Sequence, residues 1–80
     1  MKYRVAYASP ASEALNKLPD PADFKVQVQA TIGTNPYGHA STQVGPDKDR
    51  REATVAGVIL RYMVSTGVLT VTVVRLIPPP

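Results

Sequence analysis

Cysteine and tryptophan are absent from this 80-residue chain, and histidine and phenylalanine each occur once. Without cysteine the chain has neither a disulfide framework nor a thiolate metal site. A small domain buries a modest share of its surface, so its stability depends on packing or on a partner that covers apolar groups. The sequence also lacks metal-ligand spacing, paired carboxylates, a glycine-rich phosphate loop and a spaced nucleophile–base pair. We therefore expect no metal and no cofactor.

Long hydrophobic runs are missing as well. No apolar run approaches the roughly 20 residues that a membrane-spanning helix needs, and the first residues lack the pattern of a signal peptide. We therefore expect a cytoplasmic protein with no membrane partner. The length predicts a single domain over residues 1–80. A hydrophobic fraction of 44% is ordinary for a folded domain and too high for a disordered chain.

Positive charge is in slight excess. Nine lysine and arginine residues against six acidic residues give a net charge of +3 at pH 7. This balance suits a nucleic acid or an acidic protein as a partner. It is equally compatible with a soluble surface that has no such role, so charge alone leaves both readings open.

The first third of the sequence predicts one strand and two helices. Tyr3 to Ala8 alternates apolar and smaller or charged residues, as a strand does. Ser9-Pro10 has the form of a helix start, with the Ser9 hydroxyl as cap, and Pro19 stops this helix. An apolar stripe at helical spacing supports the helix: Ala11, Ala14, Leu15 and Leu18.

Asp20-Pro21 repeats the same helix-start signal, with Asp20 as cap. Phe24, Val28 and Ile32 then recur every four residues, and Gly33 suits the end of the helix. Almost no loop separates the two helices, which predicts an antiparallel hairpin. Thr34 to Asp49 is rich in turn residues, and a loop of this length is either functional or mobile.

Arg50 to Ile77 predicts a three-stranded antiparallel meander, with turns at Gly57 and at Ser65-Thr66-Gly67. In the middle strand one face carries Val58, Leu60, Tyr62 and Val64. Simple alternation places Arg75 on the presumed core face of the last strand, with Leu69, Val71, Val73 and Ile77. Either a bulge resets the alternation or the arginine emerges at the strand end. Pro78-Pro79-Pro80 cannot donate to a sheet and is expected to end the ladder.

Several segments are similar, in order, to parts of one known family. Lys2–Val5 is similar to its first strand, Ala11–Leu18 to its alanine-rich first helix, and Asn35-Pro36 to an element after its second helix. The meander adds a glycine turn, a strand ending in tyrosine and a valine-rich last strand: Ala53–Gly57, Tyr62, Leu69–Val71 and Val73–Arg75. In this combination the chain resembles the RelE/ParE superfamily of type II toxin–antitoxin toxins. The resemblance implies an α+β fold with the order β-α-α-β-β-β.

Members of this superfamily are bacterial cytoplasmic toxins, each neutralised by a cognate antitoxin. One branch cleaves mRNA on the ribosome without a metal, using basic residues to stabilise phosphate charge and a basic side chain or carboxylate to activate the ribose 2′-hydroxyl. The resemblance therefore implies an mRNA interferase or an inhibitor of translation. The alternative is a non-catalytic binder, either a DNA gyrase inhibitor or an inactive homologue that only binds its antitoxin. The three final prolines favour it, because the ribonuclease branch carries basic and tyrosine residues there.

Arg61 and Arg75 are the first two candidate catalytic residues. Each sits in an otherwise apolar strand, where a guanidinium must reach solvent, a carboxylate or a ligand. The resemblance to the RelE/ParE superfamily implies that both arginines line the face of the sheet that contacts RNA. The alternative is an edge position or a salt bridge, for example with Glu52. His39 is the third candidate, as a general acid or base, because histidine titrates near neutral pH; the alternative is a solvent-exposed loop residue.

Lys48, Arg50 and Arg51 form the densest positive cluster and are candidate contacts to RNA phosphates. Nearby acidic residues offer the alternative of a solvated, partly neutralised start of a strand. Tyr62 is a candidate for stacking on a base, the alternative being a position in the core.

Overall fold

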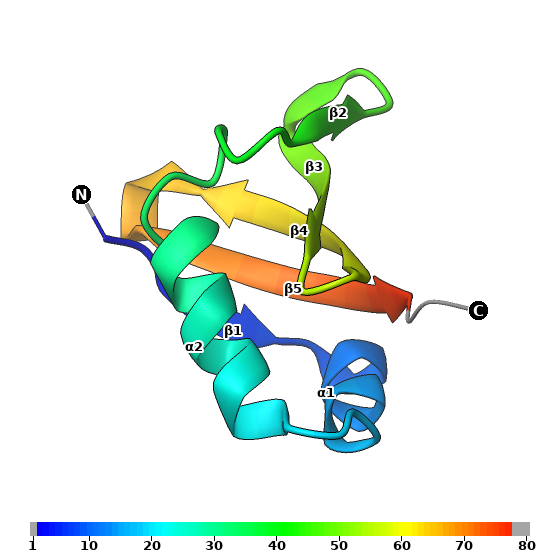
Figure 1. Ribbon diagram of the computed structural model, residues 1–80. Helices are drawn as coiled ribbons and strands as arrows, with labels where there is room; N and C mark the ends of the chain where they lie inside the picture. Colours follow the sequence, from blue (N-terminus) through cyan, green and yellow to red (C-terminus); the bar gives the residue numbers. More distant parts are fainter. Residues whose placement is uncertain (1, 78–80) are drawn as a thin grey trace.

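The computed structural model describes residues 2–77, so the ladder-ending role predicted for Pro78–Pro80 lies outside the described residues. Two helices cover one face of a sheet (Figure 1). The elements in chain order are β1 (Arg4–Tyr7), α1 (Ser9–Asn16), α2 (Pro21–Thr31), β2 (Thr42–Val44), β3 (Asp47–Val55), β4 (Val58–Ser65), the 3-10 turn η1 (Thr66–Val68) and β5 (Thr70–Ile77). None of the described helices is long and apolar enough to cross a membrane.

The sheet has five strands in the order β1-β5-β4-β3-β2. β1 pairs in parallel with β5, and the other pairs are antiparallel. The predicted α+β class and the meander of the last three strands are confirmed. The prediction was incomplete at both edges, because the turn-rich segment contains β2 and because β1 joins the meander through a parallel pair. A mixed sheet results, in which the last strand occupies an interior position.

The helix starts differ from each other. Asp20 caps α2 as predicted, since its Oδ1 accepts a hydrogen bond of 3.1 Å from the Asp23 backbone N–H. The predicted Ser9 cap is wrong: Ala8 is the cap residue of α1 and provides no side-chain hydrogen bond. Pro10 in the first turn of α1 fixes φ near its helical value. Proline lacks a backbone N–H, but an N–H in the first turn would have no partner within the helix, so α1 forms without that cap.

The two helices occupy different parts of the same sheet face. α1 packs on β5, whereas α2 packs on β3 and β1, so each makes its main contacts with the sheet. The core lies between these layers and contains the predicted stripes of both helices and of β4. Its members include Ala11, Leu15, Phe24, Val28, Ile32, Leu60, Tyr62, Val64, Val71 and Val73. The opposite face of the sheet is not covered by either helix (Figure 1).

Candidate functional site

A row of charged side chains crosses three strands on the open face of the sheet. Glu52 of β3 pairs with Arg61 of β4, and Arg61 pairs with Arg75 of β5. In the next row, Arg50 pairs with Met63. Residues that pair directly across strands point to the same face and lie close together. The strand register therefore gathers three arginines, Arg50, Arg61 and Arg75, on the side that carries no helix.

A β-bulge places Arg75 in this row. Tyr62 pairs with Val73 while Arg61 pairs with Arg75, so Val74 is an extra residue without a partner in β4. Val73 is fully buried and Leu76 is 6% exposed, whereas Val74 and Arg75 between them are both exposed. Of the two readings that alternation left open, the bulge is therefore the one found. The placement of Arg75 and Ile77 on the core face by simple alternation was wrong.

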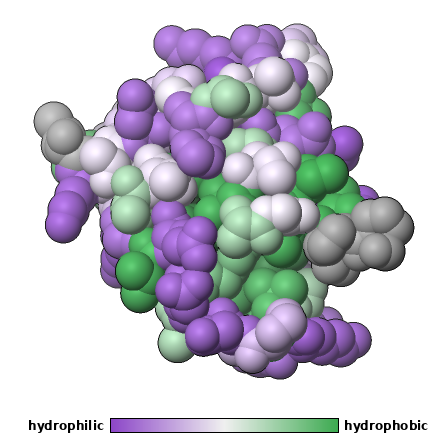
Figure 2. Space-filling model, viewed as in Figure 1, coloured by the Kyte–Doolittle hydropathy of each residue, from purple (hydrophilic) through white to green (hydrophobic). Residues whose placement is uncertain are grey.

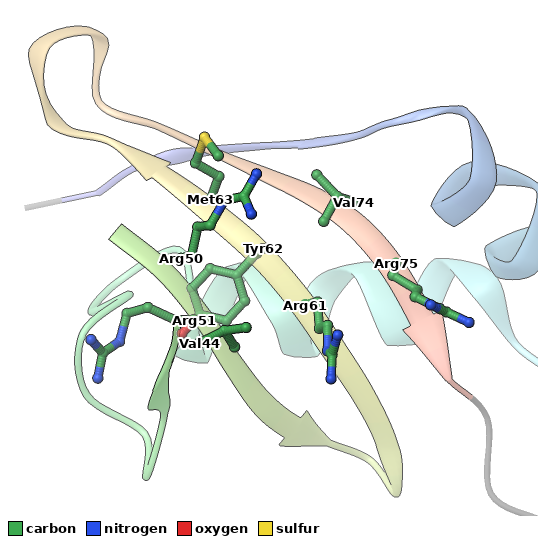
Figure 3. Close-up of a pocket in the computed structure, with 8 residues that line it drawn as sticks. All are labelled: Val44, Arg50, Arg51, Arg61, Tyr62, Met63, Val74 and Arg75. Carbon is green, nitrogen blue, oxygen red and sulfur yellow. The ribbon is translucent and has the colours of Figure 1, made fainter. Parts of the chain in front are cut away.

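These side chains line a groove of about 310 Å³. Figure 3 shows the lining residues: Val44, Arg50, Arg51, Arg61, Tyr62, Met63, Val74 and Arg75. Among them, Arg51 and Tyr62 pair with each other on the face that carries the helices, whereas the other arginines belong to the open face. Met63 and Val74 provide apolar walls between the arginines. A groove with concentrated guanidinium charge and apolar walls is suited to an anionic ligand that also has apolar parts.

Arg61 is held by one carboxylate and keeps free donors. Its Nε donates to Glu52 Oε1 at 3.0 Å, which confirms the salt bridge considered from the sequence. Its side chain is 46% exposed. Within residues 2–77 its two terminal nitrogens make no hydrogen bond, and Arg75 makes none with its side chain. A guanidinium anchored through Nε presents its other edge to a ligand in a fixed orientation.

Arg51 serves the fold of the neighbouring loop, although the groove touches it. Its Nε donates to Ser41 Oγ at 2.8 Å, one terminal nitrogen donates to the Ser41 carbonyl at 3.1 Å, and the other donates to the Lys48 carbonyl at 3.1 Å. Its guanidinium also lies 5.5 Å from the centre of the Tyr37 ring. The contacts tie β3 to the segment before β2, so the structure does not support Arg51 as a primary contact to RNA phosphates.

Tyr62 belongs to the core, so the stacking role predicted for it is wrong. The residue is 1% exposed, which leaves no ring face for a base. Its hydroxyl donates to the Pro36 carbonyl at 2.5 Å, and burial raises the pKa of Tyr62. The ring therefore fixes the Asn35-Pro36 end of the loop to the middle of the sheet.

His39 and Lys48 lie outside the lining of the groove. His39 is exposed in a left-handed backbone conformation, and its Nε2 lies 3.2 Å from the Thr54 carbonyl. Lys48 is exposed on β3, two residues before Arg50. The structure thus brings together Arg50, Arg61 and Arg75 of the predicted set, and it does not bring the histidine to them.

Tyr37 holds the loop before β2 against β3. Its hydroxyl donates to Asp49 Oδ1 at 2.7 Å, and this hydrogen bond, with a smaller contribution from burial, raises the pKa of Tyr37 to about 12. Met63 and Val74 line the groove and were missed from the sequence. Only the strand register and the bulge reveal them, because hydrophobic residues in strands are ordinarily assigned to the core.

Two solved structures share this backbone arrangement. One is a chain of the toxin–antitoxin complex RelBE2 from Mycobacterium tuberculosis, with a TM-score of 0.77, 20% identity, and coverage of 98% of this chain and 99% of that chain. The other is a chain of the archaeal RelE–RelB complex from Pyrococcus horikoshii OT3, with a TM-score of 0.73, 19% identity, and coverage of 98% and 96%. The expected RelE-like fold is confirmed. A scan of protein-family models and a search of curated proteins both find no match.

Proposed function

We propose that this chain is the toxin of a type II toxin–antitoxin pair, that its open sheet face binds mRNA, and that a cognate antitoxin neutralises it. The observation that carries the proposal is the arginine groove on the uncovered face of a sheet whose fold recurs in toxin–antitoxin complexes. Each RNA linkage carries a phosphate, and guanidinium groups bind phosphate through paired N–H donors. The groove therefore matches RNA in charge.

The arginine rows suggest how a strand of RNA lies in the groove. Arg61 and Arg75 are neighbours across β4 and β5 and hold one phosphate between them. Arg50, one row along the strands, contacts a neighbouring phosphate. No exposed aromatic ring among the described residues lines the groove, so phosphate contacts dominate and base stacking contributes little. Binding of this kind weakens steeply as salt concentration rises.

We further propose metal-independent, ribosome-dependent cleavage of the bound mRNA. The ribose 2′-oxygen attacks the adjacent phosphorus, the bond from phosphorus to the 5′-oxygen breaks, and a 2′,3′-cyclic phosphate forms. Glu52 is the one described carboxylate that contacts a groove arginine, and it accepts the proton from the 2′-hydroxyl. The leaving 5′-oxygen takes a proton from water. Arg61 and Arg75 stabilise the negative charge that develops on the phosphate.

One observation favours a second candidate, a non-catalytic binder such as a DNA gyrase inhibitor or an inactive antitoxin-binding homologue. The charged side chains that line the groove are all guanidinium groups, and no histidine or lysine is among the described lining residues. The arginine side chain stays protonated at neutral pH, so it supplies positive charge without acting as a general acid. Such a groove is sufficient for binding a nucleic acid or an acidic protein surface.

The two candidates are separated by setting primer extension beside a gyrase supercoiling assay. The purified chain is added to a bacterial translation extract, and mRNA ends are mapped with and without ribosomes. We expect new 5′ ends within codons of translated mRNA, only when ribosomes are present, and unchanged supercoiling by gyrase. An Arg61→Ala, Arg75→Ala double variant is the matched inactive sample, and Lys17→Ala, an exposed cation at the end of α1, is the matched control.

Each contrary outcome is informative. Inhibition of supercoiling without new mRNA ends overturns the cleavage proposal in favour of the gyrase candidate. If wild type leaves both mRNA and gyrase unaffected but binds its antitoxin, the chain is the inactive homologue. If it also fails to bind the product of the adjoining open reading frame, the toxin–antitoxin proposal is wrong.

A further inference from the structure

The end of β3 that carries Arg50 has little support from the sheet. The pair of Arg50 and Met63 is the last in the ladder between β3 and β4. On the other side of β3, a register shift leaves residues 48–50 without a partner in β2, within the part of the chain that the structure describes. None of residues 42–50 is buried, and Figure 2 shows mostly hydrophilic surface around β2 and the start of β3, at the top of the view. The ladder therefore holds Arg50 from one side only, and burial contributes little.

Tyr37 contacts both neighbours of Arg50 in β3. Its hydroxyl donates to Asp49 Oδ1 at 2.7 Å, and its ring centre lies 5.5 Å from the Arg51 guanidinium. Side chains alternate along a strand, so Asp49 and Arg51 share the helix side of the sheet while Arg50 points to the open face. Figure 3 shows Arg50 beside its partner Met63, whereas Arg51 extends in a different direction. One tyrosine on the helix side thus holds the strand on both sides of an arginine that enters the groove.

Tyr37 itself projects from a well-anchored turn. The Gly38 N–H donates to the Asn35 carbonyl at 3.1 Å and closes the turn. Pro36, whose ring fixes its own φ, is fully buried, and its carbonyl accepts the hydrogen bond of 2.5 Å from the Tyr62 hydroxyl. The contacts of Tyr37 therefore connect a buried anchor in the middle of the sheet to the exposed end of β3.

We propose that Tyr37 is a positioning residue for Arg50. By holding Asp49 and Arg51, it keeps the backbone of Arg50 in the place from which the guanidinium reaches its phosphate. This rests on the proposed function, which puts RNA in the groove, and it assigns a role to a residue that is not part of the groove lining. A strand end that is ordered before binding does not have to be ordered by the ligand, so less binding free energy is lost. Tyr37 acts through β3 and does not contact RNA.

The test uses Tyr37→Phe, which removes the hydrogen bond to Asp49 and leaves the net charge unchanged. Fluorescence anisotropy measures binding of a short single-stranded RNA whose 2′-oxygens are methylated, so that binding is observed without cleavage. We expect the affinity to fall about fivefold, the size of the net contribution of one hydrogen bond. We also expect a shallower dependence of affinity on salt, because one phosphate contact is weakened.

Tyr3→Phe is the matched control, since the Tyr3 hydroxyl makes no hydrogen bond within residues 2–77. It is expected to leave both the affinity and the salt dependence unchanged. Thermal unfolding of each variant establishes that the protein is folded at the temperature of the binding measurement.

A double-mutant cycle separates positioning of Arg50 from general support of the fold. In an Arg50→Ala background, Tyr37→Phe is expected to change the affinity less than about twofold, because the contact that it supports is already gone. In an Arg61→Ala background, it is expected to keep its effect of about fivefold. A residue that only stabilises the fold lowers the affinity equally in both backgrounds, and that result would overturn the inference.

The remaining outcomes distinguish this inference from the proposed function. If wild type binds the RNA and Tyr37→Phe binds it equally well, the positioning role is wrong while the RNA groove stands. If wild type does not bind the RNA at any salt concentration, the proposed RNA groove fails, and the inference fails with it because it names a contact to that RNA.

Discussion

Arg61 and Arg75 face each other directly across the antiparallel pair of β4 and β5. Like charges in this position destabilise a sheet, and one carboxylate, Glu52, contacts only the first of them. This pair of arginines therefore does not contribute to the stability of the fold. Its presence is readily explained by an anionic ligand that joins the two groups, as the proposed function requires.

The first prediction concerns this pair. Arg75→Ala is expected to abolish growth arrest while the free energy of unfolding stays within about 0.5 kcal/mol of wild type or rises, because an exposed repulsion is removed. Arg75→Lys keeps the charge without the planar fork and should recover only part of the activity. Growth after induction and denaturant unfolding are the measurements. Retained toxicity in Arg75→Ala would remove the residue from the mechanism.

The second prediction concerns the bulge. Deleting Val74 leaves Val73 inside, Arg75 outside and Leu76 inside, which is regular strand alternation with the register of Arg61 and Arg75 unchanged. We therefore expect the deletion variant to fold, with a melting temperature within about 8 °C of wild type, equivalent to roughly 1 kcal/mol.

Deletion of Met63 is its matched control. β4 has no extra residue to lose, so this deletion turns Val64 away from the core, and the lost burial alone costs about 1.5–3 kcal/mol. Circular dichroism during heating compares the two. Equal destabilisation by both deletions would show that the bulge is needed for the fold itself.

The third prediction concerns the buried hydroxyl of Tyr62. Tyr62→Phe leaves the Pro36 carbonyl without its donor and is expected to cost about 1–3 kcal/mol in the free energy of unfolding. Tyr3→Phe, which removes a hydroxyl that makes no hydrogen bond within residues 2–77, serves as control and should cost less than about 0.5 kcal/mol. Both variants should still arrest growth at temperatures where they are folded. Loss of toxicity in a folded Tyr62→Phe protein would argue for a direct role in the site.

The fourth prediction concerns alkaline pH. Burial raises the pKa of Tyr7 to about 12, above the ordinary value near 10 that holds in the unfolded chain. Below pH 10 both states keep the proton, so Tyr7 adds no pH dependence there. Between pH 10 and 12 the unfolded chain loses the proton first, and stability falls by up to about 1.4 kcal/mol per pH unit through this one group.

Tyr7→Phe should therefore flatten the alkaline limb of the curve of unfolding free energy against pH. At pH 7 it should cost nothing, because the Tyr7 hydroxyl is buried and has no hydrogen-bond partner within residues 2–77. Tyr37→Phe also removes a hydroxyl whose pKa is raised. It removes the hydrogen bond to Asp49 as well, so it is expected to lower the free energy of unfolding at pH 7. Denaturant unfolding at several pH values distinguishes the two variants.

The sequence was sufficient to predict the elements that repeat a simple period. The alternation of β4 and the four-residue spacing of Phe24, Val28 and Ile32 identified their buried faces correctly. Asp20 was recognisable as a cap because its side chain and the following proline act locally. In these segments the local signal and the tertiary packing agree.

The remaining features depend on contacts between distant segments, which no local pattern encodes. β2 has three residues and forms because β3 offers an edge to it. The structural contacts of Arg51 could not be predicted because its partners, Ser41 and the Lys48 carbonyl, are fixed only when the loop folds back on β3. Tyr62 was weighed both as a stacking residue and as a core residue. Alternation placed it on the buried face of β4, but the partner of its hydroxyl, the Pro36 carbonyl, is fixed only by the packing of the loop.

The position of β5 inside the sheet has a consequence for biosynthesis. β5 lies between β1 and β4, so the earliest and latest described strands of the chain are neighbours. A nascent chain that lacks β5 has no partner for β1, and non-local pairing of this kind is slow to form. Arg75 also leaves the exit tunnel after all the other arginines. The three arginines Arg50, Arg61 and Arg75 therefore come together only after β5 has been synthesised and has paired with β4.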